Sequence, residues 1–133
     1  MKKEKCCGAI VSHDGKVLLV KHKNGGHIAF PKGHMEYGES EKETAIREVF
    51  EETGLNIKII DGFRYEMVYR IYNNALKKVV FFQGEKISGV EKAQEEEISE
   101  LMWVPYEEAY KLLTHEDSKK MLNSFIEYQK VYI

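Results

Sequence analysis

The chain has little of what marks several special classes of protein. It contains only two prolines, one tryptophan and two cysteines among 133 residues, and its formal net charge is −2. A charge so close to zero gives no basic field for a nucleic acid or an anionic membrane. No apolar run approaches the roughly 18 residues of a membrane span. The basic start is not followed by an apolar segment long enough for a signal peptide.

What is present is the composition of a globular domain, with 43% hydrophobic and 32% charged residues. A chain of this length can bury a core without disulfides or structural metals, so we expect a single domain over residues 1–133. Cys6 and Cys7 are neighbours and do not easily reach disulfide geometry with each other. We therefore expect two buried thiols in a reducing compartment, the cytoplasm.

The order of apolar runs and turn residues predicts a mixed α/β fold, with a sheet packed between helices. Asp14-Gly15 lies between two β-favouring runs and predicts a hairpin. Pro31 and Gly33 should keep residues 31–34 out of regular structure. The expected strands are residues 6–12, 16–21, 55–60, 62–72, 78–85 and 101–104, and the expected later helices are residues 105–113 and 118–128.

A central helix is predicted between Ser40 and Gly54. Ser40 is a favoured N-cap, and Glu43 three residues later completes a capping box. Gly54 suits the left-handed position that follows a helix. The apolar residues at helical spacing, which should face the core, are Ala45, Ile46, Val49 and Phe50.

This helix carries Glu48, Glu51 and Glu52 on one face, because they are separated by three or four positions. An acidic helix face is usually only solvated. Here, however, the like charges repel one another by a few tenths of a kcal/mol per pair and lie beside the apolar stripe. Arg47 can hold Glu51 through an ion pair four positions apart. The repulsion indicates that a cation binds at this face.

The segment before the helix contains Lys32, Gly33 and His34, which offer donors suited to phosphate oxygens. Mg²⁺ prefers a few carboxylates together with substrate phosphates and water, so the combination predicts a magnesium site. Zinc is not expected, because the five histidines are scattered and both cysteines lie near the start.

Residues 33–55, GHMEYGESEKETAIREVFEETGL, match the signature of the Nudix hydrolases at every position. The fixed residues of this match are Gly33, Glu39, Arg47, Glu48, Glu51, Glu52 and Gly54. The resemblance implies the Nudix α/β/α sandwich. It also implies hydrolysis of a pyrophosphate link in a nucleoside diphosphate joined to another moiety, with Mg²⁺ or Mn²⁺.

By this resemblance the metal would be held by Glu48, Glu51 and Glu52 and by the backbone near Gly33. Arg47 and Glu39 would brace the loop and helix, and Gly33 and Gly54 would serve the motif structurally. The cations neutralise phosphate charge and lower the pKa of a bound water, and a carboxylate takes its proton. Many family members add a glutamate from a late loop.

In this chain the late loop before Trp103 is acidic, and more than one of its glutamates could be the additional residue. Glu97 is the first candidate for the base or an extra ligand, Glu96 is the second, and Glu100 is a further one. The alternative interpretation is an acidic loop that is exposed to solvent and has no part in catalysis or metal binding.

The segments 7–11, 31–34 and 62–63 look like those of the asymmetric diadenosine tetraphosphate hydrolases, which release ATP and AMP. Lys32 as a point charge and His34 as a donor would bind the bridge phosphates. Phe81 would be the aromatic shelf for adenine, unless it is a core residue. Tyr37 and Tyr69 are weaker candidates for the same role.

The chain departs from this subgroup at Ile28 and Phe30, where a tryptophan and a proline are usual. Three alternatives therefore stay open. They are a nucleoside triphosphate pyrophosphatase, an RNA 5′-pyrophosphohydrolase, and a nucleotide-binding domain without catalysis. Without a basic patch, we expect a small nucleotide as the partner rather than a long nucleic acid. The sequence does not fix the oligomeric state.

Overall fold

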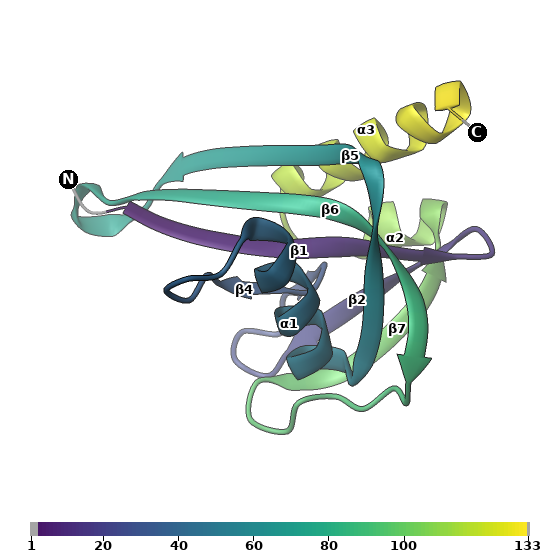
Figure 1. The fold of residues 1–133 in the computed structure, drawn as a ribbon, viewed down its shortest axis with the longest axis horizontal. Coiled ribbons are helices and arrows are strands. Elements are labelled where there is room, and N and C mark those ends of the chain that lie inside the picture. Colours follow the sequence, from purple (N-terminus) through teal and green to yellow (C-terminus); the bar gives the residue numbers. More distant parts are fainter. Residues whose placement is uncertain (1–2, 133) are drawn as a thin grey trace.

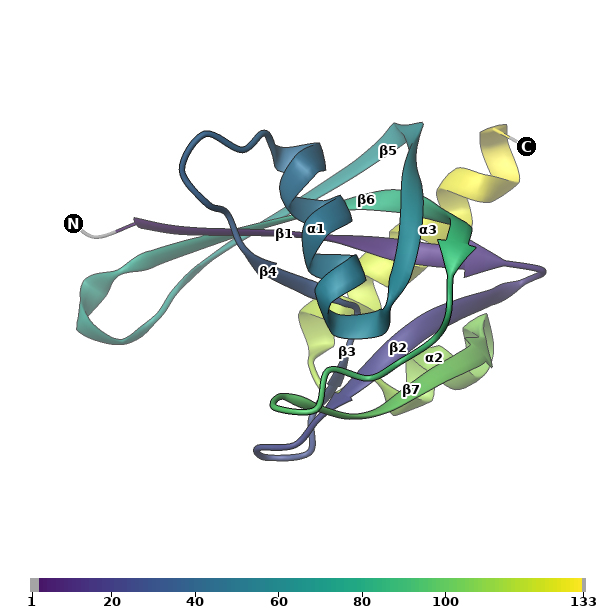
Figure 2. The ribbon, with the colours of Figure 1, turned by 60° about the horizontal axis from the view of Figure 1, so that its bottom comes forward.

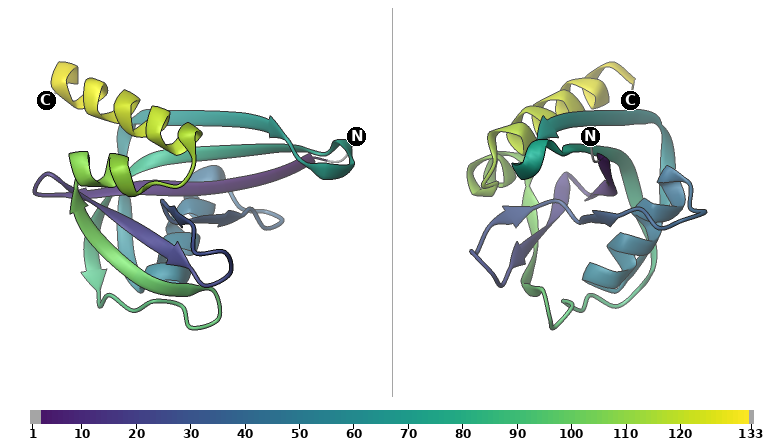
Figure 3. Two further views of the ribbon diagram at one scale, coloured as in Figure 1. Left: turned by 180° about the vertical axis from the view of Figure 1, so that it is seen from behind. Right: turned by 90° about the vertical axis from the view of Figure 1, so that its left-hand side faces the viewer.

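A computed structural model describes residues 3–132 and shows a sheet between helices (Figure 1). Helix α1 (Glu41–Thr53) covers one side of the sheet, and α2 (Tyr106–Leu112) and α3 (Glu116–Tyr132) lie on the other (Figure 3). The predicted α/β/α arrangement is confirmed. None of the helices in the described part of the chain is long and apolar enough to cross a membrane.

Seven strands make up the sheet formed by residues 3–132. They are β1 (Lys3–His13), β2 (Lys16–His22), β3 (Ile28–Ala29), β4 (Lys32–His34), β5 (Leu55–Arg70), β6 (Leu76–Gly89) and β7 (Ile98–Pro105). The main order is β3-β2-β1-β6-β5, with β4 pairing with β1 and β7 pairing with β2. Strands β1 and β6 are parallel, and the other pairs are antiparallel. The sheet is therefore mixed, as predicted.

The segment predicted to be irregular forms strand β4 instead, so that prediction is wrong. Lys32 pairs with Gly8 of β1, and His34 pairs with Cys6. The absence of a side chain at Gly8 permits this pairing, because a Cβ there would overlap the carbonyl oxygen of Pro31. Backbone hydrogen bonding to β1 thus overrides the local effect of Pro31 and Gly33.

The two strands predicted for residues 55–60 and 62–72 are one strand, β5, bent in the middle. The pairing with β6 runs from Ile60–Gln83 directly to Arg64–Phe82, so residues 61–63 have no partner in the ladder. An insertion of this kind bends a strand without ending it. The bend is visible as a corner of β5 in Figure 1. A 3-10 turn, η1 (Tyr72–Asn74), joins β5 to β6.

Helix α1 begins and ends as predicted. The Oγ of Ser40 accepts the backbone N–H of Glu43 at 3.1 Å, and Glu43 Oε1 accepts the N–H of Ser40 at 2.8 Å. Gly54 follows the helix with φ of 79°. A Cβ at Gly54 would overlap the carbonyl oxygen of Val90, so the late loop lies directly against this end of α1.

One residue of the helix faces the opposite way from the prediction. Ala45 and Val49 are fully buried and Ile46 is partly buried, but Phe50 is 49% exposed. The buried stripe turns through Val49 to Glu52 and Thr53. Phe50 lies about 100° around the helix from Val49, on the solvent side. The prediction that Phe50 faces the core is wrong.

The core has two sides because residues of β1 alternate between the faces of the sheet. Cys6 lies in the cluster with Phe30 and Phe81, and Cys7 lies in the cluster with Ala45 beneath α1. Both cysteines are buried and free, as predicted.

Candidate active site

Arg47 ties three segments together at the N-terminal part of the site. Its Nε and Nη2 donate to the carboxylate of Glu39 at 2.6 and 3.0 Å, and Nη2 also donates to the carbonyl oxygen of His34 at 2.8 Å. Its Nη1 donates to Glu51 Oε1 at 3.0 Å. Hydrogen bonding from Arg47 lowers the pKa of Glu39 to about 2. The guanidinium therefore fixes the loop before α1, strand β4 and the helix relative to one another.

Glu48 lies directly against the backbone of β4. A Cβ at Gly33 would overlap its carboxylate, so only glycine leaves room there. The Glu48 side chain is 13% exposed, and its Oε1 is 3.6 Å from Arg47 Nη1. Burial, followed by the charge of Glu51, raises the pKa of Glu48. The signature glycine and the first signature glutamate of the helix thus occupy adjoining space.

Glu52 is a buried carboxylate, with 5% of its surface exposed. Its Oε1 accepts the backbone N–H of Lys32 at 3.3 Å. Burial, followed by the negative charge of Glu48, raises the pKa of Glu52 to about 8. Burial, followed by the charge of Lys77, lowers the pKa of Lys32. Neighbouring residues of opposite charge with pKa values perturbed by burial are typical of functional sites.

The acidic loop between β6 and β7 runs past the C-terminal end of α1 (Figure 2). The N–H groups of Lys92 and Gln94 donate to the carbonyl oxygens of Thr53 and Glu52 at 2.8 and 3.2 Å. The charge of Glu97 contributes to the raised pKa values of both Glu48 and Glu52. The structure therefore brings Glu97 to the helix carboxylates.

These side chains could hold a divalent cation. Burial and then the repulsion between neighbouring carboxylates raise the pKa values of Glu48 and Glu52, and a positive ion would offset that repulsion. Across residues 3–132, no group of three or more histidine, cysteine, aspartate or glutamate side chains is arranged to hold a metal ion by itself. Mg²⁺ keeps several waters and takes one or two carboxylates plus substrate phosphates, so an open carboxylate set fits it better than zinc.

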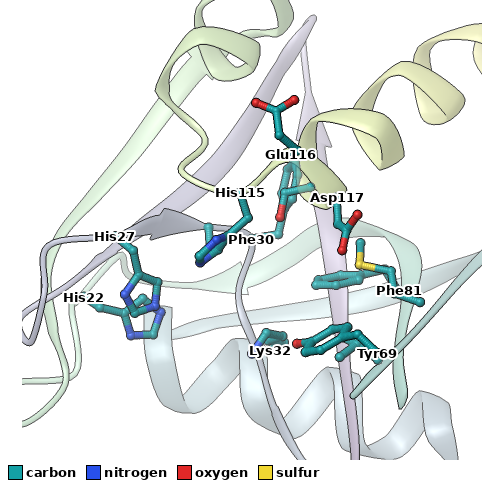
Figure 4. A pocket seen from close by; sticks show the side chains of 13 residues that line it. His22, His27, Phe30, Lys32, Tyr69, Phe81, His115, Glu116 and Asp117 are labelled. Atoms are coloured by element: carbon teal, nitrogen blue, oxygen red, sulfur yellow. The ribbon is translucent and has the colours of Figure 1, made fainter. Parts of the chain in front are cut away.

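A pocket of about 410 Å³ lies beside Lys32 (Figure 4). This volume falls in the range of small-molecule sites. Phe81 lines the pocket although it is only 3% exposed, and it meets Phe30 edge-on with ring centroids 6.2 Å apart. Phe81 is therefore both a core residue and part of the pocket floor. Tyr69 lines the same pocket.

Two candidate substrate residues lie away from this pocket. His34 is two residues beyond Lys32 on β4, is largely exposed, and places its Nε2 3.0 Å from Glu4 Oε1. Tyr37 is fully exposed in the loop before α1. Both line a separate pocket near the start of β1. The structure thus brings Lys32 and Phe81 together, with His34 and Tyr37 elsewhere.

Four residues near the pocket were missed by sequence reasoning. His22, His27 and His115 line it, and the charge of Lys77 lowers the pKa of Lys32. The histidines come from distant parts of the chain, so no local pattern could have found them. Lys77 is one of several polar residues on a strand and has no distinguishing signal.

The fold and the signature helix define a class. The family model of the NUDIX domain matches residues 3–125, so the chain belongs to the NUDIX family and is a Nudix hydrolase.

Within the family, the chain is similar to curated asymmetrical bis(5′-nucleosyl)-tetraphosphatases. It is 37% identical to the Sus scrofa protein over 110 residues, which cover 79% of this chain and 74% of the relative. The Mus musculus protein is 36% identical over the same length, with the same coverage.

Solved structures show the same fold. A binary complex of the C. elegans Ap4A hydrolase superposes with a TM-score of 0.85 at 22% identity, covering 97% of this chain and 99% of that one. The E. coli ORF135 protein superposes with a TM-score of 0.83 at 24% identity, covering 99% and 94%.

Proposed function

We propose that the protein is a Mg²⁺-dependent dinucleoside tetraphosphate hydrolase that converts diadenosine tetraphosphate to ATP and AMP. The observation that carries this proposal is the position of Lys32, which joins the buried carboxylate of Glu52 to a nucleotide-sized pocket. The mammalian relatives, named for this reaction on bis(5′-nucleosyl) tetraphosphates, support it.

The metal would be held by Glu48, Glu51 and Glu52, with the backbone at Gly33. When bound, Mg²⁺ neutralises phosphate charge and lowers the pKa of a coordinated water. Glu51 now pairs with Arg47, 3.0 Å away, and this pairing keeps its carboxylate beside the other two.

The remaining steps belong to the chain's own residues. Lys32 binds the phosphate bridge as a point charge. Glu97 accepts the proton of the attacking water as its oxygen bonds to phosphorus. The bond from phosphorus to the bridging oxygen breaks, and the leaving phosphate keeps that electron pair. Arg47 takes no part in bond making and positions the helix through Glu39.

Base binding would use the apolar floor of the pocket. Adenine is flat and can stack on an aromatic face, which Phe81 and Tyr69 offer from β6 and β5. Phe30 lines the same pocket and packs edge-on against Phe81. Small nucleotides fit a pocket of this size, whereas a long nucleic acid would need a basic surface.

The test is a product analysis with a panel of nucleotides in Mg²⁺ and, separately, in Mn²⁺. The panel contains diadenosine tetraphosphate, nucleoside triphosphates and a 5′-triphosphate RNA. We expect ATP and AMP in equal amounts from the first substrate, at the highest kcat/KM of the set. Poor turnover of this substrate beside rapid cleavage of another would refute the assignment. Tight binding without turnover of any member would indicate a non-catalytic nucleotide-binding domain.

A further inference from the structure

Three histidines form one side of the pocket, and we refer to His22, His27 and His115 as the histidine wall. The rings of His22 and His27 are stacked, with centroids 4.0 Å apart and planes 10° from parallel. The ring of His115 lies 5.9 Å from that of His27 at an angle of 50°. All three line the pocket beside Lys32 (Figure 4).

The stacked rings disfavour a positive charge on both imidazoles at once in the free protein. Two positive charges at the separation of these rings repel each other. Burial, then His27 and Lys32, lower the pKa of His22 to about 4. Burial, then His115 and Lys32, lower the pKa of His27. Burial and the neighbouring charges therefore disfavour the charged form of both rings in the free protein.

The far side of the pocket has the opposite charge. Glu116 and Asp117 line it at the start of α3, and Figure 4 places them across from Lys32. Phosphate groups are repelled from that side and attracted to the side of Lys32. The apolar floor around Phe81 lies between the two and suits an uncharged base. The pocket is thus polarised, and an anion is favoured on the side of Lys32, which His22 and His27 also line.

We propose that His22, His27 and His115 form a proton-sharing subsite for the phosphate chain, which binds beside Lys32 with uptake of a fraction of a proton by the wall. The step is protonation of an imidazole by solvent, which converts it to an imidazolium that faces the bound anion. An anion stabilises the charged form of the ring, as opposite charges do at this range. The identity of the ligand rests on the proposed function, but the binding of an anion does not.

The charged groups around the histidine wall determine whether the imidazole pKa values rise or fall when an anion binds. Lys32 on β4 opposes protonation of His22 and His27, and the carboxylates of Glu116 and Asp117 line the far side of the same pocket. A phosphate beside Lys32 offsets the lysine charge, so the imidazole pKa values rise on binding. Affinity for the phosphate chain therefore increases as the pH falls from about 7 toward the free values.

The direct test is an NMR titration of the histidine ring protons with and without sodium sulfate, at equal ionic strength maintained with sodium chloride. Sulfate is a dianion that does not titrate near neutral pH. We expect it to raise the pKa of His22 or His27 by roughly one unit. His13, on the exposed turn between β1 and β2, is the internal control and should not respond beyond the chloride effect. A response of the wall no larger than that of His13 would overturn the subsite.

The second test measures proton uptake when metal-free protein binds diadenosine tetraphosphate. Calorimetry in two buffers of different ionisation enthalpy, at pH 6, gives the number of protons bound. We expect uptake in the wild type, loss of most of it in His22→Phe/His27→Phe, which retains stacked rings, and wild-type uptake in His13→Phe. Unchanged uptake in the double variant would count against the wall.

The two proposals can fail separately. A sulfate response without cleavage of diadenosine tetraphosphate would support the subsite and reject the proposed substrate. Cleavage to ATP and AMP with no response of the wall to sulfate would support the proposed function and reject the subsite.

Discussion

The backbone N–H of Lys32 donates to Oε1 of Glu52 over 3.3 Å, and the same lysine lines the neighbouring pocket. Strand β4 and helix α1 therefore meet at a buried carboxylate. A shift of β4 would therefore displace both the Lys32 side chain in the pocket and the Glu52 carboxylate on the helix.

Glu52→Gln should stabilise the metal-free protein while abolishing activity. The pKa of Glu52 is raised from 4.5 to about 8 by burial and by Glu48, so the folded protein holds a proton that the unfolded chain has released across this range. Metal-free protein therefore loses stability as the pH rises from about 4.5 to about 8. Glutamine removes the buried charge, and we expect a gain of about 1–3 kcal/mol at pH 8.5.

Thermal melts of the Glu52→Gln variant at pH 5 and pH 8.5 check the stability, and kcat should fall by several orders of magnitude. Glu66→Gln is the control, because Glu66 pairs with Lys78 and Arg64 and has no contact with the carboxylates of Glu48, Glu51 and Glu52 among the ion pairs of the described residues. Near-normal kcat in the Glu52 variant would show that Glu52 is not an essential ligand.

Glu97→Gln should lower kcat by about 10²-fold or more, which is the range expected for loss of a general base. The effect should appear in kcat rather than in the melting temperature, because the backbone of Glu97, not its side chain, bonds to Lys23. Steady-state kinetics in Mg²⁺ measure it, with Glu95→Gln from the same loop as the control. An unchanged rate would move the role to Glu96 or Glu48.

Arg47→Lys should damage both folding and catalysis although the charge is kept. A lysine cannot donate at once to the two oxygens of Glu39, to the His34 carbonyl and to Glu51. We expect a loss of about 1–3 kcal/mol in urea denaturation, together with a fall in kcat.

Arg64→Lys is the matched control for Arg47→Lys, because Arg64 also makes a forked pair, with Glu41, but outside the carboxylate cluster. It should affect stability and leave kcat within about twofold. Equal losses of kcat in both variants would mean that Arg47 acts only through general stability.

Gly33→Ala should disrupt the position of Glu48, because the added Cβ overlaps its carboxylate. We expect weaker Mg²⁺ dependence of activity and reduced stability, measured by activity over a metal titration and by thermal melting. In Gly33→Ala/Glu48→Ala the overlap is gone, so stability should recover while activity stays low. Failure of the double variant to regain stability would place the strain elsewhere in β4.

The helix could be predicted almost completely, because its signals are local. The cap at Ser40, the box with Glu43 and the stop at Gly54 depend on residues a few positions apart. The prediction for Phe50 fails because periodicity alone does not say where an apolar stripe ends. Glu52, two residues further along, is buried instead, which no hydrophobicity pattern would predict.

Long-range pairing accounts for the remaining differences. Strand β4 exists because Gly8 of β1 admits it, and the single β5 exists because β6 pairs on both sides of residues 61–63. The histidine wall likewise depends on bringing His115 next to His27 across the fold. Spacing in the sequence contains no information on such encounters.

The two adjacent thiols allow the faces of the sheet to be followed independently. Cys6 is buried on the face of the sheet that carries the pocket, whereas Cys7 is buried on the face covered by α1. A thiol reagent can reach either one only after local opening. In Cys7→Ala the remaining Cys6 would report on local opening of the pocket side, and in Cys6→Ala the remaining Cys7 would report on local opening beneath α1. Ligands could then be ranked by which side they close.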